Sequence, residues 1–170
     1  MNIRKLTRLS MLLALSVVLS IIESMIPVIS NIAPGMKLGL ANAVIVFAIY
    51  LLSFKDALYI SIMRVIIVGI LRTGLFNITF FFSLTGALLS IIFMYLSKRY
   101  TKLSVVGVSV VGAITHSIGQ VIIAIIFLNN INVVYYLPYL LLMSIPAGVI
   151  VGMSANQVIK HFCKMETNIK

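Results

Sequence analysis

The sequence predicts an all-α integral membrane protein with six transmembrane helices. Of its 170 residues, 62% are hydrophobic and only 9% are charged, and the mean hydropathy is +1.20. A soluble domain carries about 25% charged residues, so this chain has too little polar surface to face water on all sides. We therefore expect contact with the lipid bilayer and no nucleic-acid partner, although the net charge is +10. The single cysteine, Cys163, excludes an intrachain disulfide.

Six apolar stretches are separated by segments that contain proline, glycine, asparagine or charge. A helix needs about 20 apolar residues to cross the hydrocarbon layer, and the second stretch meets this length only marginally. The first follows the basic segment "RKLTR"; it is too long for a signal peptide and lacks a cleavage site, so we expect a retained helix. The predicted helices, all in one domain over residues 1–170, cover 9–29, 38–53, 57–75, 78–97, 103–128 and 137–159.

Positive charge predicts the orientation, because Lys and Arg are concentrated in cytoplasmic segments. With the N-terminus inside, only Lys37 and Arg72 fall on the outer side, and Arg64 lies within a helix. The other positive residues fall on the inner side: Arg4, Lys5, Arg8, Lys55, Lys98, Arg99, Lys102, Lys160, Lys164 and Lys170. We therefore predict a multi-pass membrane protein with both termini in the cytoplasm. The membrane that we expect is a cell (plasma) membrane of the prokaryotic type.

Polar side chains inside the apolar stretches are the candidate functional residues. A charge near the bilayer centre costs a few kcal/mol and usually faces a cavity or a partner. The helical rise places these residues in the middle or outer half of the membrane, and several helices contribute them, so we expect one outward-facing pocket. The candidate substrate-binding residues are Glu23, Lys37, Asn42, Arg64, Arg72, His116 and Gln120.

The segment "NIAPGMKLGLAN", residues 31–42, is predicted to cover this pocket. Pro34 and Gly35 suit the two central positions of a type II turn, which would fold Lys37 back over the outer mouth. The charges expected in the outer half, including Lys37, are mainly positive. We therefore expect a small-molecule ligand that is anionic or partly anionic.

Simpler explanations remain open for the same residues. Glu23 and Arg64 would also be explained as a structural ion pair. His116 and Gln120 lie one turn apart and would also be explained by hydrogen bonds to a neighbouring helix. Arg72 would suit a charge that reaches from a helix end to the interface. One histidine without a second ligand predicts neither a metal site nor a proton relay, and we expect no cofactor.

Small residues recur on the first predicted helix. Ser16, Ser20 and Ser24 occupy every fourth position, and Ala14 lies close by. Small residues at this spacing allow close contact between helices in membranes. The pattern predicts either a partner surface made by Ala14, Ser16 and Ser20, or packing within the bundle.

The sequence lacks the motifs of several catalytic classes. It contains no G-x-x-x-x-G-K-[ST] loop for nucleotide phosphates. Its three acidic residues, Glu23, Asp56 and Glu166, are far apart in the chain, whereas diphosphate-transfer chemistry ordinarily needs carboxylates that hold magnesium. We expect a binding subunit that depends on another protein for energy, and no catalysis by this chain alone.

Several segments together resemble one family over nearly the whole chain. They are "PGMKLGLAN", "MRVIIVGILRTG", "SLTGALLSIIFMYLSKR", "GVSVVGAITHSIGQ" and "YYLPYLLLMSIPAGVIVG". The most specific are the PG-x-KLGLAN loop and the H-x-x-GQ element at His116, Gly119 and Gln120. The resemblance is to the Gx transporter family, also labelled heptaprenyl diphosphate synthase component I.

The resemblance has two different functional implications. Proteins of this kind are similar to the S component of energy-coupling factor (ECF) transporters, a six-helix bundle that captures a vitamin or related nutrient beneath its first outer loop. Such a subunit pairs with a transmembrane coupling subunit and two cytoplasmic ATPases. Its first helix typically offers an A-x-x-x-A surface, whereas here Val18 follows Ala14.

The second label implies a non-catalytic membrane component of heptaprenyl diphosphate synthase that binds a prenyl diphosphate. A structural assembly factor without a ligand is the remaining alternative.

Overall fold

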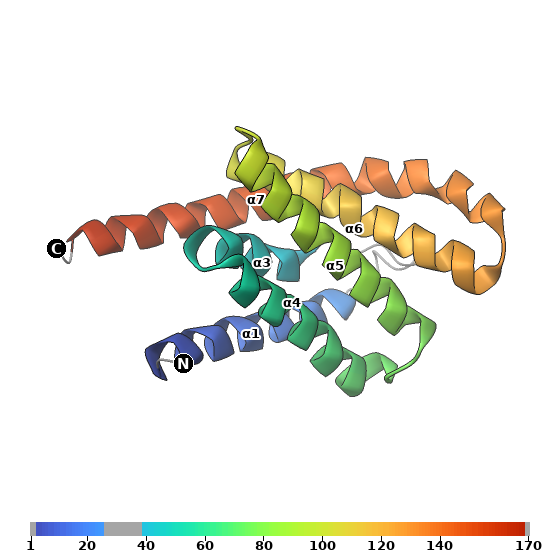
Figure 1. Ribbon diagram of the computed structural model, residues 1–170, viewed down its shortest axis with the longest axis horizontal. Helices are drawn as coiled ribbons and strands as arrows, with labels where there is room; N and C mark the ends of the chain where they lie inside the picture. Colours follow the sequence, from blue (N-terminus) through green and yellow to red (C-terminus); the bar gives the residue numbers. More distant parts are fainter. Residues whose placement is uncertain (1–2, 26–38, 169–170) are drawn as a thin grey trace.

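The computed structural model describes residues 3–25 and 39–168, which form helices and their connections (Figure 1). The α-helices in these residues are α1 Ile3–Ser24, α3 Leu40–Leu51, α4 Phe54–Val68, α5 Ile78–Tyr100, α6 Val105–Leu128 and α7 Leu137–Asn168. A π-helical turn, η1 (Gly69–Thr73), continues α4, and a 3-10 helix, η2 (Ile131–Tyr136), precedes α7. No strand occurs in these two segments, so the predicted all-α class with six helices is confirmed.

The observed helices extend beyond the predicted ranges mainly at their polar ends. α1 begins at Ile3 within the basic N-terminal segment, and α7 continues to Asn168. Hydropathy marks only the part of a helix that suits lipid, whereas backbone hydrogen bonding can continue into water. The predicted end of the first helix at residue 29 and most of the covering loop lie outside the described residues.

Four helical segments are long and apolar enough to cross a membrane. They are Ile3–Ser24, Ile78–Tyr100, Val105–Leu128 and Ile131–Lys164, so the chain is a multi-pass membrane protein. The helix α3 has 12 residues and is therefore about 18 Å long, well short of the ~30 Å hydrocarbon layer. The prediction of six full crossings is thus supported for four segments. Neither α3, with 12 residues, nor α4, with 15 residues, is among them.

The short helix α3 lies in the centre of the bundle. It contacts α1, α4, α5, α6 and α7. A helix that is hydrophobic on all sides is buried, and the buried residues of α3 are Ala41, Val44, Ile45, Val46, Ala48 and Ile49. Because protein surrounds α3, it does not need the length of a lipid-exposed helix.

Charged side chains bind both ends of α3. At its start, the carboxylate Oε1 of Glu23 accepts a hydrogen bond from the backbone N–H of Gly39 at 2.5 Å. At its end, Lys98 Nζ donates to the carbonyl of Ile49 at 2.7 Å and lies over the Tyr50 ring. Helix ends carry unpaired N–H and C=O groups with the dipole's partial charges. An acid at the first end and a base at the last one therefore stabilise this buried helix.

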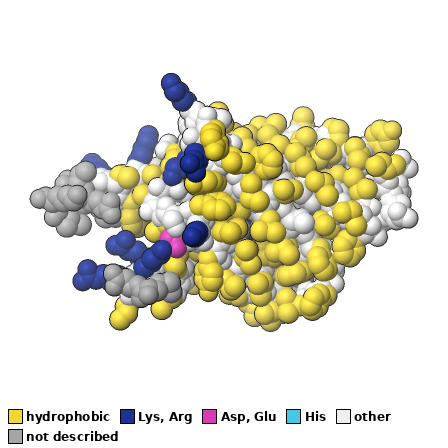
Figure 2. All heavy atoms as spheres, in the orientation of Figure 1, with side chains coloured by type: hydrophobic (Ala, Val, Ile, Leu, Met, Phe, Trp, Pro, Cys, Tyr) yellow, Lys and Arg dark blue, Asp and Glu magenta, His cyan; other side chains and the backbone are white. Residues whose placement is uncertain are grey.

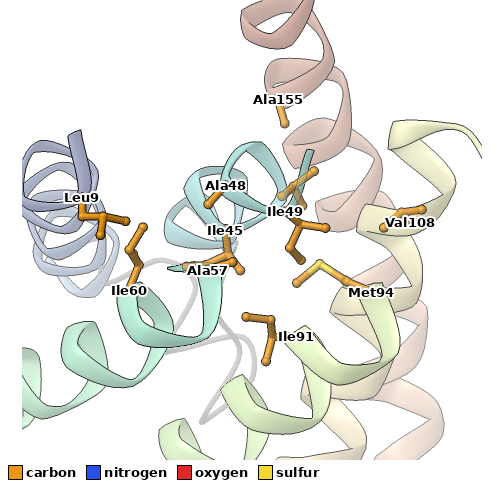
Figure 3. Close-up of a cluster of buried hydrophobic side chains, with 11 residues drawn as sticks. Leu9, Ile45, Ala48, Ile49, Ala57, Ile60, Ile91, Met94, Val108 and Ala155 are labelled. Carbon is orange, nitrogen blue, oxygen red and sulfur yellow. The ribbon is translucent and has the colours of Figure 1, made fainter. Parts of the chain in front are cut away.

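The apolar core surrounds the C-terminal half of α3 (Figure 3). Leu9, Ala57 and Val108 come from early turns of their helices, and Met94 comes from a late turn of α5. The core therefore lies toward the end of the bundle that holds both chain termini (Figure 1). Lys and Arg side chains gather at the same end on the face shown in Figure 2. This grouping agrees with the predicted topology, while the cytoplasmic location of that end stays a prediction.

Glycines allow α5, α6 and α7 to approach closely. A Cβ atom added at Gly119 would lie 2.9 Å from Gly86 Cα, and one at Gly152 would lie 2.7 Å from Val106 Cα. Both neighbouring atoms belong to the backbone, so the helices would have to separate to admit a side chain.

We predict that Gly152→Ala lowers the free energy of unfolding by about 1–3 kcal/mol, the usual range for overpacking. The matched control is Gly107→Ala, where the added methyl would meet only the Leu103 side chain at 3.2 Å. Because alanine favours a helix over glycine, the control should be neutral or stabilising. Denaturant titration in detergent measures both values, and equal effects would contradict the close α6–α7 contact.

An ion pair joins the N-terminal ends of α1 and α4. Lys5 Nζ lies 2.8 Å from Asp56 Oδ1. The hydroxyl of Ser53, the residue before α4, donates to Asp56 Oδ2 and accepts from the Asp56 backbone N–H. The hydrogen bond from Lys5, followed by that from Ser53, lowers the pKa of the Asp56 carboxyl.

A lowered folded-state pKa means that the contribution of Asp56 to stability is complete above its unfolded pKa, about 4. It is lost as the pH falls through the folded-state pKa. We predict that Asp56→Asn reduces stability at pH 7 by up to about 1 kcal/mol, as for an exposed ion pair. Unfolding curves should show this difference shrinking on acidification. A difference that grows at low pH would contradict the assignment.

Candidate functional site

A cavity of about 310 Å³ lies at the N-terminal end of α3. All six described α-helices contribute to its wall, and so does η1. Gly39, Ala41 and Asn42 provide the part formed by α3 and the residue before it. The cavity forms here because α3, which separates the surrounding helices, begins only at Leu40. The surrounding helices continue past this point.

Arg64 is the buried cation of this cavity. Its side chain is only 6% exposed, and Nη1 donates to Asn42 Oδ1 at 3.2 Å. A guanidinium carries a fork of several N–H donors, and within the described part of the chain this is the one hydrogen bond that the Arg64 side chain makes. The remaining donors are therefore suited to an anionic group in the cavity.

Glu23 adds a buried carboxylate to the same wall. It is 7% exposed and accepts from Gly39, as described above. Its negative charge acts electrostatically on Arg64. Both the ion-pair explanation and a role in ligand binding therefore stay open for these two residues.

Arg72 connects two elements at the rim of the cavity. It belongs to η1, and its Nη1 donates to the hydroxyl of Ser24 near the end of α1. The π-helical geometry of η1 differs from the α-helix that the sequence predicted through residue 75, and such turns are frequent at functional sites. Phe80 packs at the start of this turn, where a Cβ on Gly69 would lie 2.7 Å from its ring.

The α5–α6 crossing positions His116 and Gln120. A Cβ on Gly86 would lie 2.9–3.0 Å from the His116 ring, and Gly119 packs against the Gly86 backbone. Both His116 and Gln120 line the cavity, and Gln120 is buried. The H-x-x-GQ element therefore combines a glycine for close helix contact with two polar wall residues.

Of the predicted substrate-binding residues, the structure brings six to this one cavity: Glu23, Asn42, Arg64, Arg72, His116 and Gln120. Lys37 and the Pro34–Gly35 turn lie outside the described residues. A role in ligand contact stays a prediction for all seven.

Hydroxyl groups in the wall were missed by the sequence reasoning. Ser and Thr in apolar helices commonly bond to a carbonyl of their own helix, as Ser83, Ser117 and Ser144 do. They therefore carry little signal individually. The usable signal was helical spacing, because Ser20 lies one turn from Glu23 and therefore on the same helix face. The hydroxyl residues of the wall are Ser20, Ser24, Thr79, Ser83, Ser117 and Ser144.

The structure differs from the predicted partner surface on α1. Ala14 is exposed, but Ser16 is fully buried and donates to the Leu13 carbonyl, while Ser20 lines the cavity. Ser16 and Ser20 therefore face the interior of the bundle, which is the packing alternative. Among the side chains that the structure describes, no three of His, Cys, Asp or Glu are placed to share a metal ion.

The fold and this cavity define a multi-pass α-helical membrane protein with a polar, partly charged chamber between its helices. The chain belongs to the heptaprenyl diphosphate synthase component I family, whose model matches residues 12–158. The predicted resemblance to this family is thereby confirmed. Searches of curated proteins and of solved structures find no match.

A double-mutant cycle separates the structural interaction of Glu23 and Arg64 from other effects. Removing one partner of a buried charge pair costs about 3–5 kcal/mol because the other charge is left uncompensated. We predict such a loss of stability for Arg64→Met alone. The double variant Arg64→Met with Glu23→Gln should lose less, because it leaves no uncompensated charge and the introduced glutamine keeps an oxygen for the Gly39 N–H. SDS titration without added ligand should give a coupling energy of about 1–3 kcal/mol. Additivity within ~0.5 kcal/mol would show that the charges act independently.

Proposed function

We propose that this chain is a ligand-binding membrane subunit that captures a small anionic molecule in the chamber, in the manner of an ECF S component. The observation that supports this most directly is Arg64, a buried guanidinium at the wall of a cavity with one hydrogen bond among the described residues. A buried cation is costly unless it is paired. An anionic ligand would supply further hydrogen-bond acceptors to the guanidinium, which is bonded to Asn42, and would add to the compensating charge of Glu23.

The size and lining of the chamber also favour a small ligand. Cavities that hold small molecules measure about 300–1,000 Å³, and this one measures about 310 Å³. Val65, Val68 and Phe80 provide apolar wall beside the hydroxyl and charged groups. A ligand with an anionic group and an apolar body would match both parts.

The importer role requires partner proteins, and we take their kinds from the resemblance to ECF S components. A transmembrane coupling subunit and two cytoplasmic ATPases would provide the energy, since the sequence has no nucleotide-binding loop. The plasma membrane, with both termini in the cytoplasm, would place the chamber toward the outside.

A second candidate is the non-catalytic membrane component of heptaprenyl diphosphate synthase. The family match over residues 12–158 favours it, and Arg64 would suit a diphosphate head. The heptaprenyl chain is far larger than a cavity of about 310 Å³, so most of it would have to lie outside the chamber.

The first test is identification of a co-purified small molecule by mass spectrometry. We expect an anionic compound with the wild-type protein, and a loss of about 10–100-fold in affinity for Arg64→Gln, the equivalent of one charged hydrogen bond. Arg99→Gln is the matched control, because Arg99 is exposed at the other end of α5. Wild-type protein that is repeatedly empty, together with uptake insensitive to Arg64→Gln, would contradict the importer role.

The second candidate has its own test. Prenyl transfer by a soluble catalytic partner is measured with and without this chain in lipid nanodiscs. The synthase role predicts that the chain is required and that Arg64→Gln lowers the rate. A catalytic partner that is fully active alone excludes this role.

A further inference from the structure

A second, smaller cavity of about 70 Å³ lies against the chamber. It is bounded by α5, α6, η2 and α7. Gln120 and Leu140 line both cavities, and both side chains are buried. These two side chains therefore form the partition between the chamber and this side cavity.

The side cavity differs from the chamber in its chemistry. The side chains of Phe82, Val121, Ala124 and Val133 make its wall largely apolar. None of its lining residues is charged, whereas the chamber has Glu23 and two arginines. A group that enters the side cavity must therefore be mainly apolar.

One polar atom of this wall lacks a partner. The hydroxyl of Tyr136 is buried and makes no hydrogen bond within the described part of the chain. Its ring packs against Tyr139 with 5.7 Å between centroids. A buried hydroxyl without a partner is costly, and such groups in native proteins usually have a water, an ion or a function that explains them.

We propose that the side cavity is a second subsite of the ligand site, an inference that rests on the ligand-binding function proposed above. The anionic group of the ligand lies near Arg64, and an apolar portion passes between Gln120 and Leu140. At its far end, a hydroxyl or carbonyl group hydrogen-bonds to Tyr136. The ligand class is thus an anionic head joined to an apolar or aromatic body that ends in one polar atom.

Three probes separate the contributions of head, body and terminal polar atom. They are inorganic phosphate, phenethyl phosphate and 4-hydroxyphenethyl phosphate, titrated calorimetrically into the full chain in nanodiscs. We expect affinity to rise in this order by about 10-fold at each step, the equivalent of one modest contact.

The variants assign each step to a residue. Ala124→Phe fills the side cavity, so it should abolish the advantage of both organic probes while changing phosphate affinity less than about twofold. Tyr136→Phe should abolish only the advantage of the hydroxylated probe. Ile122→Phe is the matched control on the exposed face of α6 and should preserve all three affinities.

The outcomes distinguish the subsite from the underlying function. Organic probes that bind no tighter than phosphate, or a Tyr136→Phe protein that still prefers the hydroxylated probe, would overturn the subsite and leave the anion site intact. If neither phosphate nor the organic probes bind the wild-type protein, and Arg64→Gln changes nothing, the ligand-binding function itself fails.

Discussion

The short central helix α3 is the constraint on which the rest of the structure depends. It contacts every other described α-helix, yet it has only 12 residues. Around its C-terminal half the bundle is filled by the apolar core, and at its N-terminal end the polar chamber begins. The same helix therefore borders both the apolar core of the bundle and the chamber in which we propose that a ligand binds.

The charges at the ends of α3 link these two properties. Lys98 bonds the end that faces the core, and Glu23 bonds the start that faces the chamber. Glu23 also acts on Arg64, and Arg64 bonds Asn42 of α3. An anion near Arg64 would therefore alter the electrostatic balance at the start of the central helix. Under the proposed function, ligand binding and the position of α3 would be coupled by charge.

The class of the fold and much of the candidate site could be predicted from the sequence, because a polar residue in a segment that crosses lipid is costly and therefore marks a special position. Glu23, Arg64 and Gln120 stand out only because their apolar neighbours could not tolerate an isolated charge or amide. The length of α3 could not be predicted this way, since hydropathy does not distinguish burial in protein from burial in lipid. The side cavity was also missed, because Tyr136 in a loop-like segment has no signature until packing shows its hydroxyl enclosed.

The length of α3 has a consequence for biogenesis. A segment of about 18 Å leaves backbone polar groups near its ends without water if it enters ~30 Å of hydrocarbon alone. It becomes stable there only when neighbouring helices supply partners such as Glu23 and Lys98. We therefore expect α3 to be stable in the membrane only once the neighbouring helices have assembled around it, and a chain that lacks α5, and with it Lys98, to hold this segment less stably.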